Sequence, residues 1–74
     1  MFLDGAKQTG NIEEAKIIYD ALLEDAPDNG LYRIERAKIL LALGQKQAAQ
    51  EDLKIARRSG IPSAAWKELE QKLK

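Results

Sequence analysis

The sequence predicts an all-α protein, an antiparallel stack of helix hairpins. Its composition is rich in Ala, Leu, Lys, Glu and Gln and only 5% aromatic, which favours helices over a sheet. The apolar residues recur at the three- and four-residue spacing of a helix face. Glycine or proline separates the apolar segments, at Gly10, Pro27, Gly44 and Gly60. A chain of 74 residues holds one domain at most, so we treat residues 1–74 as a single helical domain.

The first two predicted helices lie on either side of Gly10. Residues 1–9 predict a short helix that ends at this glycine, and Asn11 then caps a second helix with Glu14 as its partner in a capping box. Pro27 ends the second helix. Only Ile17 lies opposite the broad apolar face of this helix, which carries Ile12, Ala15, Ile18, Tyr19, Leu22, Leu23 and Ala26.

The third predicted helix follows a cap at Asp28 or Asn29 and ends at Gly44, which supplies a left-handed exit. Its apolar residues surround more than one face, which indicates packing on several sides; they are Tyr32, Ile34, Ala37, Ile39, Leu40, Leu41 and Leu43. Arg33 and Arg36 fall inside this apolar arc. We expect their guanidinium groups to reach carboxylates or water, with anion binding as the alternative.

The last two predicted helices end at Gly60 and at the C-terminus. Small residues permit close approach to the inner face of the fourth helix, which carries Ala48, Ala49, Leu53, Ile55 and Ala56. Pro62 begins a closing amphipathic helix, whose Trp66, Leu69 and Leu73 are expected to cover that face. Adjacent acidic residues diverge by 100° on a helix, so we expect three pairs on solvated faces. They are Glu13 with Glu14, Glu24 with Asp25, and Glu51 with Asp52.

A 34-residue period links the second and fourth predicted helices, because small and large residues recur in the same slots at this interval. The pattern resembles the tetratricopeptide repeat family over about 50 residues. It is carried by Gly10, Ala15, Tyr19, Leu22 and Pro27, then by Ala37, Leu40, Gly44, Ala49, Leu53 and Ala56. The resemblance implies an α-solenoid fragment of about five helices, with a partial repeat at 1–27, a full repeat at 28–60 and a closing helix at 61–74.

The resemblance also implies where a partner binds. Such repeats turn the first helix of each pair toward a concave groove, and here that face carries Leu31, Ile34, Glu35, Lys38 and Leu41. Its apolar side chains favour an apolar or amphipathic segment of another protein, oriented by the opposite charges of Glu35 and Lys38. The alternative is that Leu31, Ile34 and Leu41 only contact the neighbouring helix.

Composition argues against several function classes. Without His or Cys the chain lacks the commonest general base, the thiol nucleophile and the usual transition-metal ligands. We therefore predict a non-enzymatic protein–protein interaction module or scaffold, with no catalytic, cofactor or metal site. Twelve basic and twelve acidic residues give a net charge of zero, so nucleic-acid binding is not expected. An RNA-binding helical repeat is a weaker alternative, because residues 57–62 faintly resemble the end of a pentatricopeptide repeat.

Assembly and location lead to three further expectations. The chain has an alternative role as a structural segment of a larger helical-repeat protein, without its own ligand groove. A helix over residues 1–9 is too short to cover the apolar face that follows, so we expect self-association through this end or docking of an upstream segment. The N-terminal apolar run is too short for a signal peptide, and no stretch approaches the length of a membrane span, so we expect a soluble protein, cytoplasmic or bacterial periplasmic, without membrane insertion.

Overall fold

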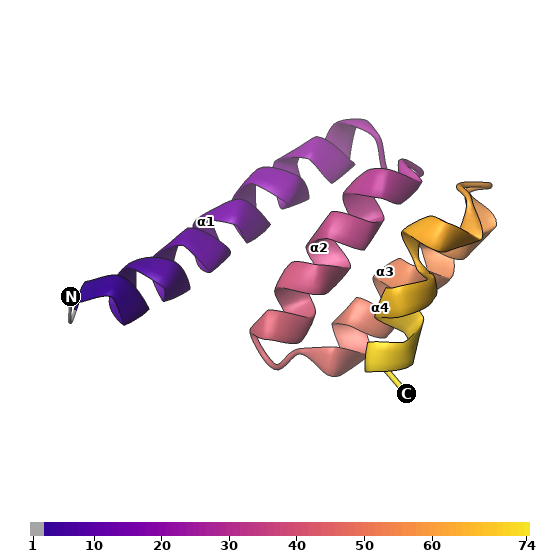
Figure 1. The fold of residues 1–74 in the computed structure, drawn as a ribbon. Helices are drawn as coiled ribbons and strands as arrows, with labels where there is room; N and C mark the ends of the chain where they lie inside the picture. Colours follow the sequence, from indigo (N-terminus) through magenta and orange to yellow (C-terminus); the bar gives the residue numbers. More distant parts are fainter. Residues whose placement is uncertain (1–2) are drawn as a thin grey trace.

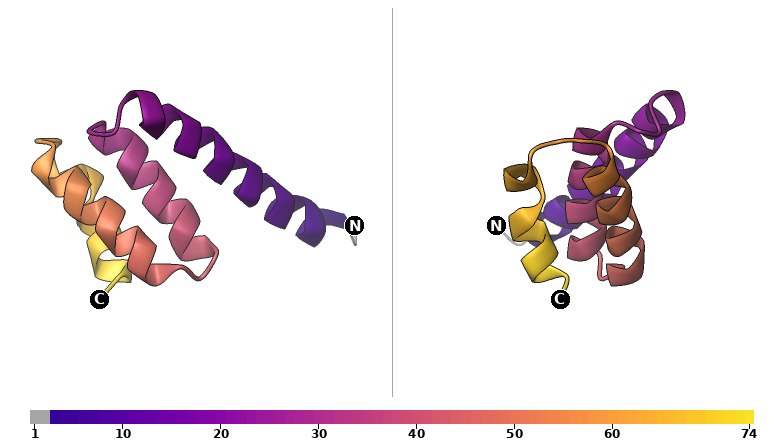
Figure 2. Two further views of the ribbon diagram at one scale, coloured as in Figure 1. Left: turned by 180° about the vertical axis from the view of Figure 1, so that it is seen from behind. Right: turned by 90° about the vertical axis from the view of Figure 1, so that its right-hand side faces the viewer.

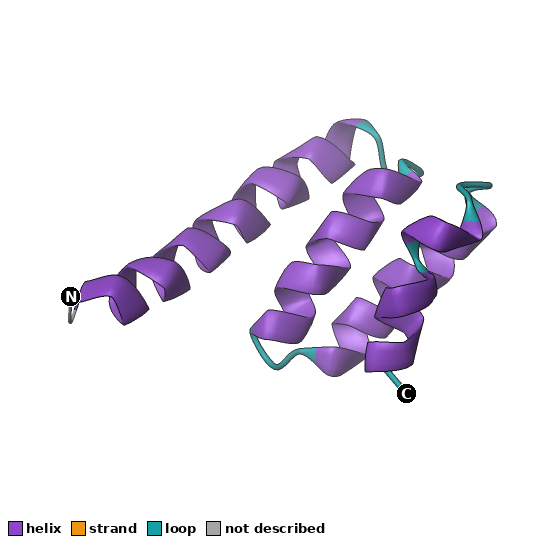
Figure 3. Ribbon diagram, in the orientation of Figure 1, coloured by secondary structure: helices purple, strands orange, loops and turns teal. Residues whose placement is uncertain are grey.

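Helices dominate the computed structural model, which describes the backbone of residues 3–74 and the side chains from residue 11 onward. The elements are α1 (Leu3–Asp25), α2 (Gly30–Ala42), α3 (Lys46–Arg58), the 3-10 turn η1 (Ser63–Ala65) and α4 (Lys67–Lys72). Residues 3–74 contain no strand (Figure 3). Consecutive helices run antiparallel, so the predicted all-α stack of helix hairpins is confirmed (Figure 1).

Helix α2 occupies the middle of the stack. It packs against α1 on one side and α3 on the other, and η1 and α4 fold back beside α2 and α3 (Figures 1 and 2). Helices α1 and α2 are close at the turn that joins them and diverge toward the N-terminus of α1 (Figure 1). Because α1 has 23 residues and α2 has 13, the N-terminal part of α1 extends beyond the packed region.

The first helix is continuous, which corrects the predicted break at Gly10. Helix α1 runs through Gly5 and Gly10, and Asn11 lies inside it instead of capping a new helix. An interior glycine costs a helix about 1 kcal/mol relative to alanine, and asparagine costs less, so neither residue forbids the helix. Residues 3–74 therefore form four α-helices and one 3-10 turn, not about five helices. Met1 and Phe2 of the predicted first helix lie outside the described residues.

Replacing Gly10 with alanine is expected to increase helix content and stabilise α1 by about 0.5–1 kcal/mol, because alanine is the better helix former at an interior position. Gly44 is the matched control. Its φ of +81° lies in the left-handed region, so Gly44→Ala is expected to destabilise the protein by about 1–2 kcal/mol. Thermal unfolding followed by circular dichroism measures both changes, and a loss of stability for Gly10→Ala would contradict the continuous helix.

Local chemistry sets the turn between α1 and α2 and the end of α2, as predicted. The Asn29 side chain accepts a hydrogen bond from the Tyr32 amide at 3.0 Å and so caps the start of α2. Helix α1 ends just before Pro27. Gly44 provides the left-handed exit from α2. These ends make α1, α2 and α3 antiparallel neighbours with short connections.

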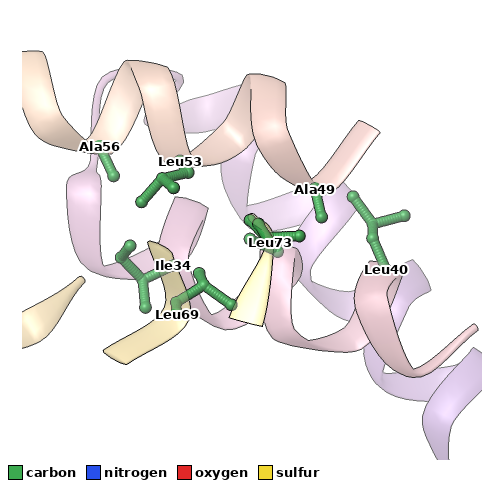
Figure 4. Close-up of a cluster of buried hydrophobic side chains, with 8 residues drawn as sticks. Ile34, Leu40, Ala49, Leu53, Ala56, Leu69 and Leu73 are labelled. Carbon is green, nitrogen blue, oxygen red and sulfur yellow. The ribbon is translucent and has the colours of Figure 1, made fainter. Parts of the chain in front are cut away.

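The core lies where α2, α3 and the C-terminal segment meet, and Figure 4 shows side chains converging there from all three. It consists of Ile34, Ala37, Leu40, Ala49, Leu53, Ala56, Leu69 and Leu73. The prediction that Leu69 and Leu73 cover the inner face of α3 is confirmed. Trp66, predicted as part of this cover, is only half-buried and packs at the edge of the cluster. The Arg57 guanidinium lies 4.9 Å from its ring centre, where a cation–π contact is favourable.

Candidate functional site

The predicted partner-binding residues divide between the core and the surface. Ile34 is 2% exposed and belongs to the same buried cluster as Leu69, so it is not available to a partner. This is the contact with a neighbouring helix that the alternative interpretation predicts. Leu31 is 58% exposed near the start of α2. Glu35 and Lys38 lie on the exposed side of α2 and form a loose ion pair of 3.4 Å.

Two of the predicted residues, Lys38 and Leu41, line a groove between α2 and the C-terminal segment. We call this the α2–α4 groove. Its lining consists of Lys38, Leu41, Ala42, Ala64, Ala65, Glu68, Leu69 and Lys72. Its volume is about 430 Å³, which is within the range of sites that hold ligand groups. The sequence does not place its second wall, because that wall depends on how η1 and α4 dock onto α2.

The groove forms because the large side chains beside it point toward the core and only small side chains lie at the surface. Leu69 turns into the core, and Leu41 lies half-buried against it, so these two leucines provide an apolar base. Ala42 and Ala64 are exposed and too short to close the space above that base. The amphipathic spacing of the closing segment was the available sequence signal for this wall, since it brings Leu69 inward and leaves Glu68 and Lys72 outward.

The charged side chains at the rim of the groove have a net positive charge. Lys38 lies on the α2 side, and Lys72 and Glu68 lie on the α4 side. Lys72 is 3.9 Å from Glu68, and Lys38 contacts Glu35 at 3.4 Å, with all four side chains well exposed. Exposed pairs of this kind contribute little stability, so both ammonium groups remain able to meet an incoming carboxylate.

A second polar cluster joins the first three helices and centres on Asp52, which is 2% exposed. Arg33 Nη1 donates a hydrogen bond to Asp52 at 2.8 Å, and Arg36 donates two, at 2.7 and 2.8 Å. Arg36 also donates to Asp20 on α1 at 2.9 Å. The predicted solvated position of Asp52 is therefore wrong, whereas the expectation that both arginines reach carboxylates is confirmed.

Hydrogen bonds within this cluster shift the pKa values of Arg36 and Asp20. The bonds from Arg36 to Asp52 raise the pKa of the Arg36 guanidinium above its usual range, more than burial lowers it. Burial raises the pKa of Asp20, but the hydrogen bonds and positive charges of Lys16 and Arg36 bring it below the usual value. The guanidinium groups of Arg33 and Arg36 are already paired with carboxylates, so the cluster is a structural ion network.

Helix α1 leaves two large apolar side chains in solvent. Ile17 is 66% exposed, as the predicted wheel indicates for it, and Ile18 is 58% exposed. The predicted inward position of Ile18 is therefore wrong. Tyr19, one residue on, does face α2 and packs edge-to-face with Tyr32 at a centroid distance of 6.1 Å. The helix contacts α2 along a narrower stripe than the sequence predicts, because no further helix lies beside it within residues 3–74.

Neither metal ligands nor a membrane span mark a site in the part of the chain that the structure describes. No three His, Cys, Asp or Glu side chains there converge on a common point that could hold a metal ion. None of the described helices has the length and apolar character needed to cross a bilayer. Comparisons with protein-family models, curated proteins and solved structures found no match to this chain.

Proposed function

We propose that this chain is a non-enzymatic protein-interaction module of tetratricopeptide-repeat type, which binds one amphipathic helical segment of a partner protein in the α2–α4 groove. The observation that carries the proposal is the groove itself, where half-buried Leu41 and three alanine methyl groups lie above buried Leu69 and between two basic side chains. Helix-binding proteins commonly use such a hydrophobic groove between two helices. The 34-residue period and the helix-hairpin stack support the repeat type.

The chemistry of the groove indicates the chemistry of its ligand. An apolar face on the ligand helix meets Leu41 and the methyl groups of the three alanines, above buried Leu69. Acidic residues beside that face meet Lys38 and Lys72 at the rim, with Glu68 fixing the polarity of the ligand through repulsion. The ligand that fits is therefore a helix with a short apolar face and carboxylates on its flanks.

A labelled helical peptide of this design is expected to bind the protein, and fluorescence anisotropy measures its affinity. Lys38→Glu combined with Lys72→Glu is expected to weaken binding about tenfold, because two attractions become repulsions worth a fraction of a kcal/mol to about 1 kcal/mol each. Added salt is expected to weaken wild-type binding as well.

The matched control places the same charge change elsewhere. Lys46→Glu combined with Lys54→Glu alters two exposed lysines of α3 that do not line the groove. This variant is expected to bind the acidic peptide with an affinity close to that of the wild type. A peptide with lysines in place of the glutamates is expected to bind weakly. Absence of acidic-peptide binding to the wild type, or equal losses in the two variants, would contradict the proposed site.

A further inference from the structure

The exposed side of α1 carries an apolar strip bordered by acidic residues, which we call the α1 strip. It consists of Glu13, Glu14, Ile17, Ile18, Ala21, Glu24 and Asp25, all exposed. These residues recur along the helix side that points away from α2, since Tyr19 and Asp20 make the inward contacts. Lys16 is the single basic residue between positions 11 and 28, and it is ion-paired with Asp20 at 3.0 Å.

The charge of the chain is divided between its two halves, although its sum is zero. Residues 1–37 contain eight acidic and four basic side chains, and residues 38–74 contain four acidic and eight basic ones. The α1 strip belongs to the acidic half, and the α2–α4 groove, from Lys38 to Lys72, belongs to the basic half. One molecule therefore presents both the α1 strip, which is apolar with acidic borders, and the α2–α4 groove, which is apolar with a basic rim.

We infer that the helix received by the α2–α4 groove is the α1 strip of a second copy of this chain. Ile17 and Ile18 of one copy would cover Leu41 and the alanine methyl groups of the next, and the acidic borders of the strip would meet Lys38 and Lys72. This identification of the partner rests on the proposed function of the groove. It also gives the two exposed isoleucines a partner, which nothing else in the described chain provides.

The contact joins two different surfaces, so it is heterologous and leaves one strip and one groove free at the ends of every assembly. Association through such a contact continues beyond the dimer into open chains as concentration rises. An isologous contact between two α1 strips would instead stop at the dimer. It would also place the acidic borders of both copies against each other, which like-charge repulsion opposes.

Two complementary variants test the heterologous contact. The strip variant, Ile17→Gln with Ile18→Gln, removes the large apolar side chains of the α1 strip and keeps the groove. The groove variant, Ala42→Glu with Ala64→Glu, fills the groove with negative charge and keeps the strip. All four positions are exposed, so the fold is expected to survive, and circular dichroism checks it. Gln47→Glu with Lys54→Gln on the outer side of α3 is the control for the groove variant's charge change.

Sedimentation from micromolar to millimolar concentration gives the result. The wild type and the charge control are expected to form assemblies larger than dimers. The strip variant alone and the groove variant alone are each expected to associate about a hundredfold more weakly. A mixture of these two variants is expected to form a 1:1 complex that does not extend. A groove variant that dimerises alone would replace the inference with an α1–α1 contact. A monomeric wild type at millimolar concentration, or no complex in the mixture, would overturn it, while peptide binding to the groove would still decide the proposed function separately.

Discussion

Replacement of Asp52 with alanine is expected to destabilise the protein by about 3–5 kcal/mol, because removal of one partner leaves two guanidinium groups without their buried counter-charge. Arg33 and Arg36 retain only 16% and 22% side-chain exposure, so solvent cannot fully replace the carboxylate. A chain of this length has a total stability of about 4–11 kcal/mol, so the loss is a large share of the whole. Urea unfolding followed by circular dichroism measures it.

The neighbouring residue supplies the control for this prediction. Glu51 has the same charge, lies on the same helix and is exposed, so Glu51→Ala is expected to change stability by no more than about 0.5 kcal/mol. Asp52→Asn keeps the shape and hydrogen-bonding oxygen but removes the charge, and an intermediate loss is expected. If Asp52→Ala and Glu51→Ala had equal effects, the ion network would not hold α2 and α3 together.

Truncation of Leu69 to alanine is expected to cost about 2–5 kcal/mol, because this side chain is 3% exposed and fills the core from the C-terminal segment. Helix α4 has six residues and cannot persist alone, so loss of its buried leucine weakens docking of the whole segment against α2 and α3. The α2–α4 groove would lose one wall at the same time. Urea unfolding measures the stability, and peptide anisotropy measures the groove.

Trp66 and Lys67 provide the comparison for Leu69. Trp66 is larger than leucine but only half-buried, so Trp66→Ala is expected to cost less than Leu69→Ala. Lys67 is exposed on the same short helix, and Lys67→Ala is expected to have almost no effect on stability. A larger loss for Trp66→Ala than for Leu69→Ala would contradict the observed core.

Helix ends set by neighbouring residues were predictable from the sequence, whereas the continuation of α1 through Gly10 was not. Asn29 acts on a backbone amide three positions away and Gly44 acts through its own positive φ, so their sequence signals are sufficient. Gly10 followed by Asn11 carries a similar signal, but α1 continues through both. The difference is that nothing requires a left-handed residue at Gly10, whereas the chain must reverse direction at Gly44.

Burial of Asp52 shows why charged positions are harder to predict. Glu51 and Asp52 look alike in sequence, and which of them is buried depends on Arg33 and Arg36, located 16 to 19 residues away. The presence of both arginines inside the apolar arc of α2 was a usable signal, since a cation in that position needs a carboxylate nearby. The particular carboxylate follows from the packing of α3 against α2, which no local pattern specifies.

Only the α2 wall of the candidate site was predictable from the sequence. Lys38 and Leu41 follow from the wheel of α2, and both line the groove. Ile34 belongs to the same wheel, but the C-terminal segment packs over it and buries it. The other wall depends on how η1 and α4 dock after Gly60, and a sequence pattern gives the faces of a helix without its position.

Chemical-shift mapping of the labelled protein with the acidic amphipathic peptide tests the central claim most directly, because it reports which residues the ligand touches. Saturable shifts are predicted to centre on the amides of Lys38, Leu41, Ala65 and Leu69, on both walls of the α2–α4 groove. The outer face of α3, around Gln47 and Lys54, is predicted to stay unchanged. Shifts confined to α3 or to α1, or no shifts at saturating peptide, would contradict the assignment of the groove as the binding site.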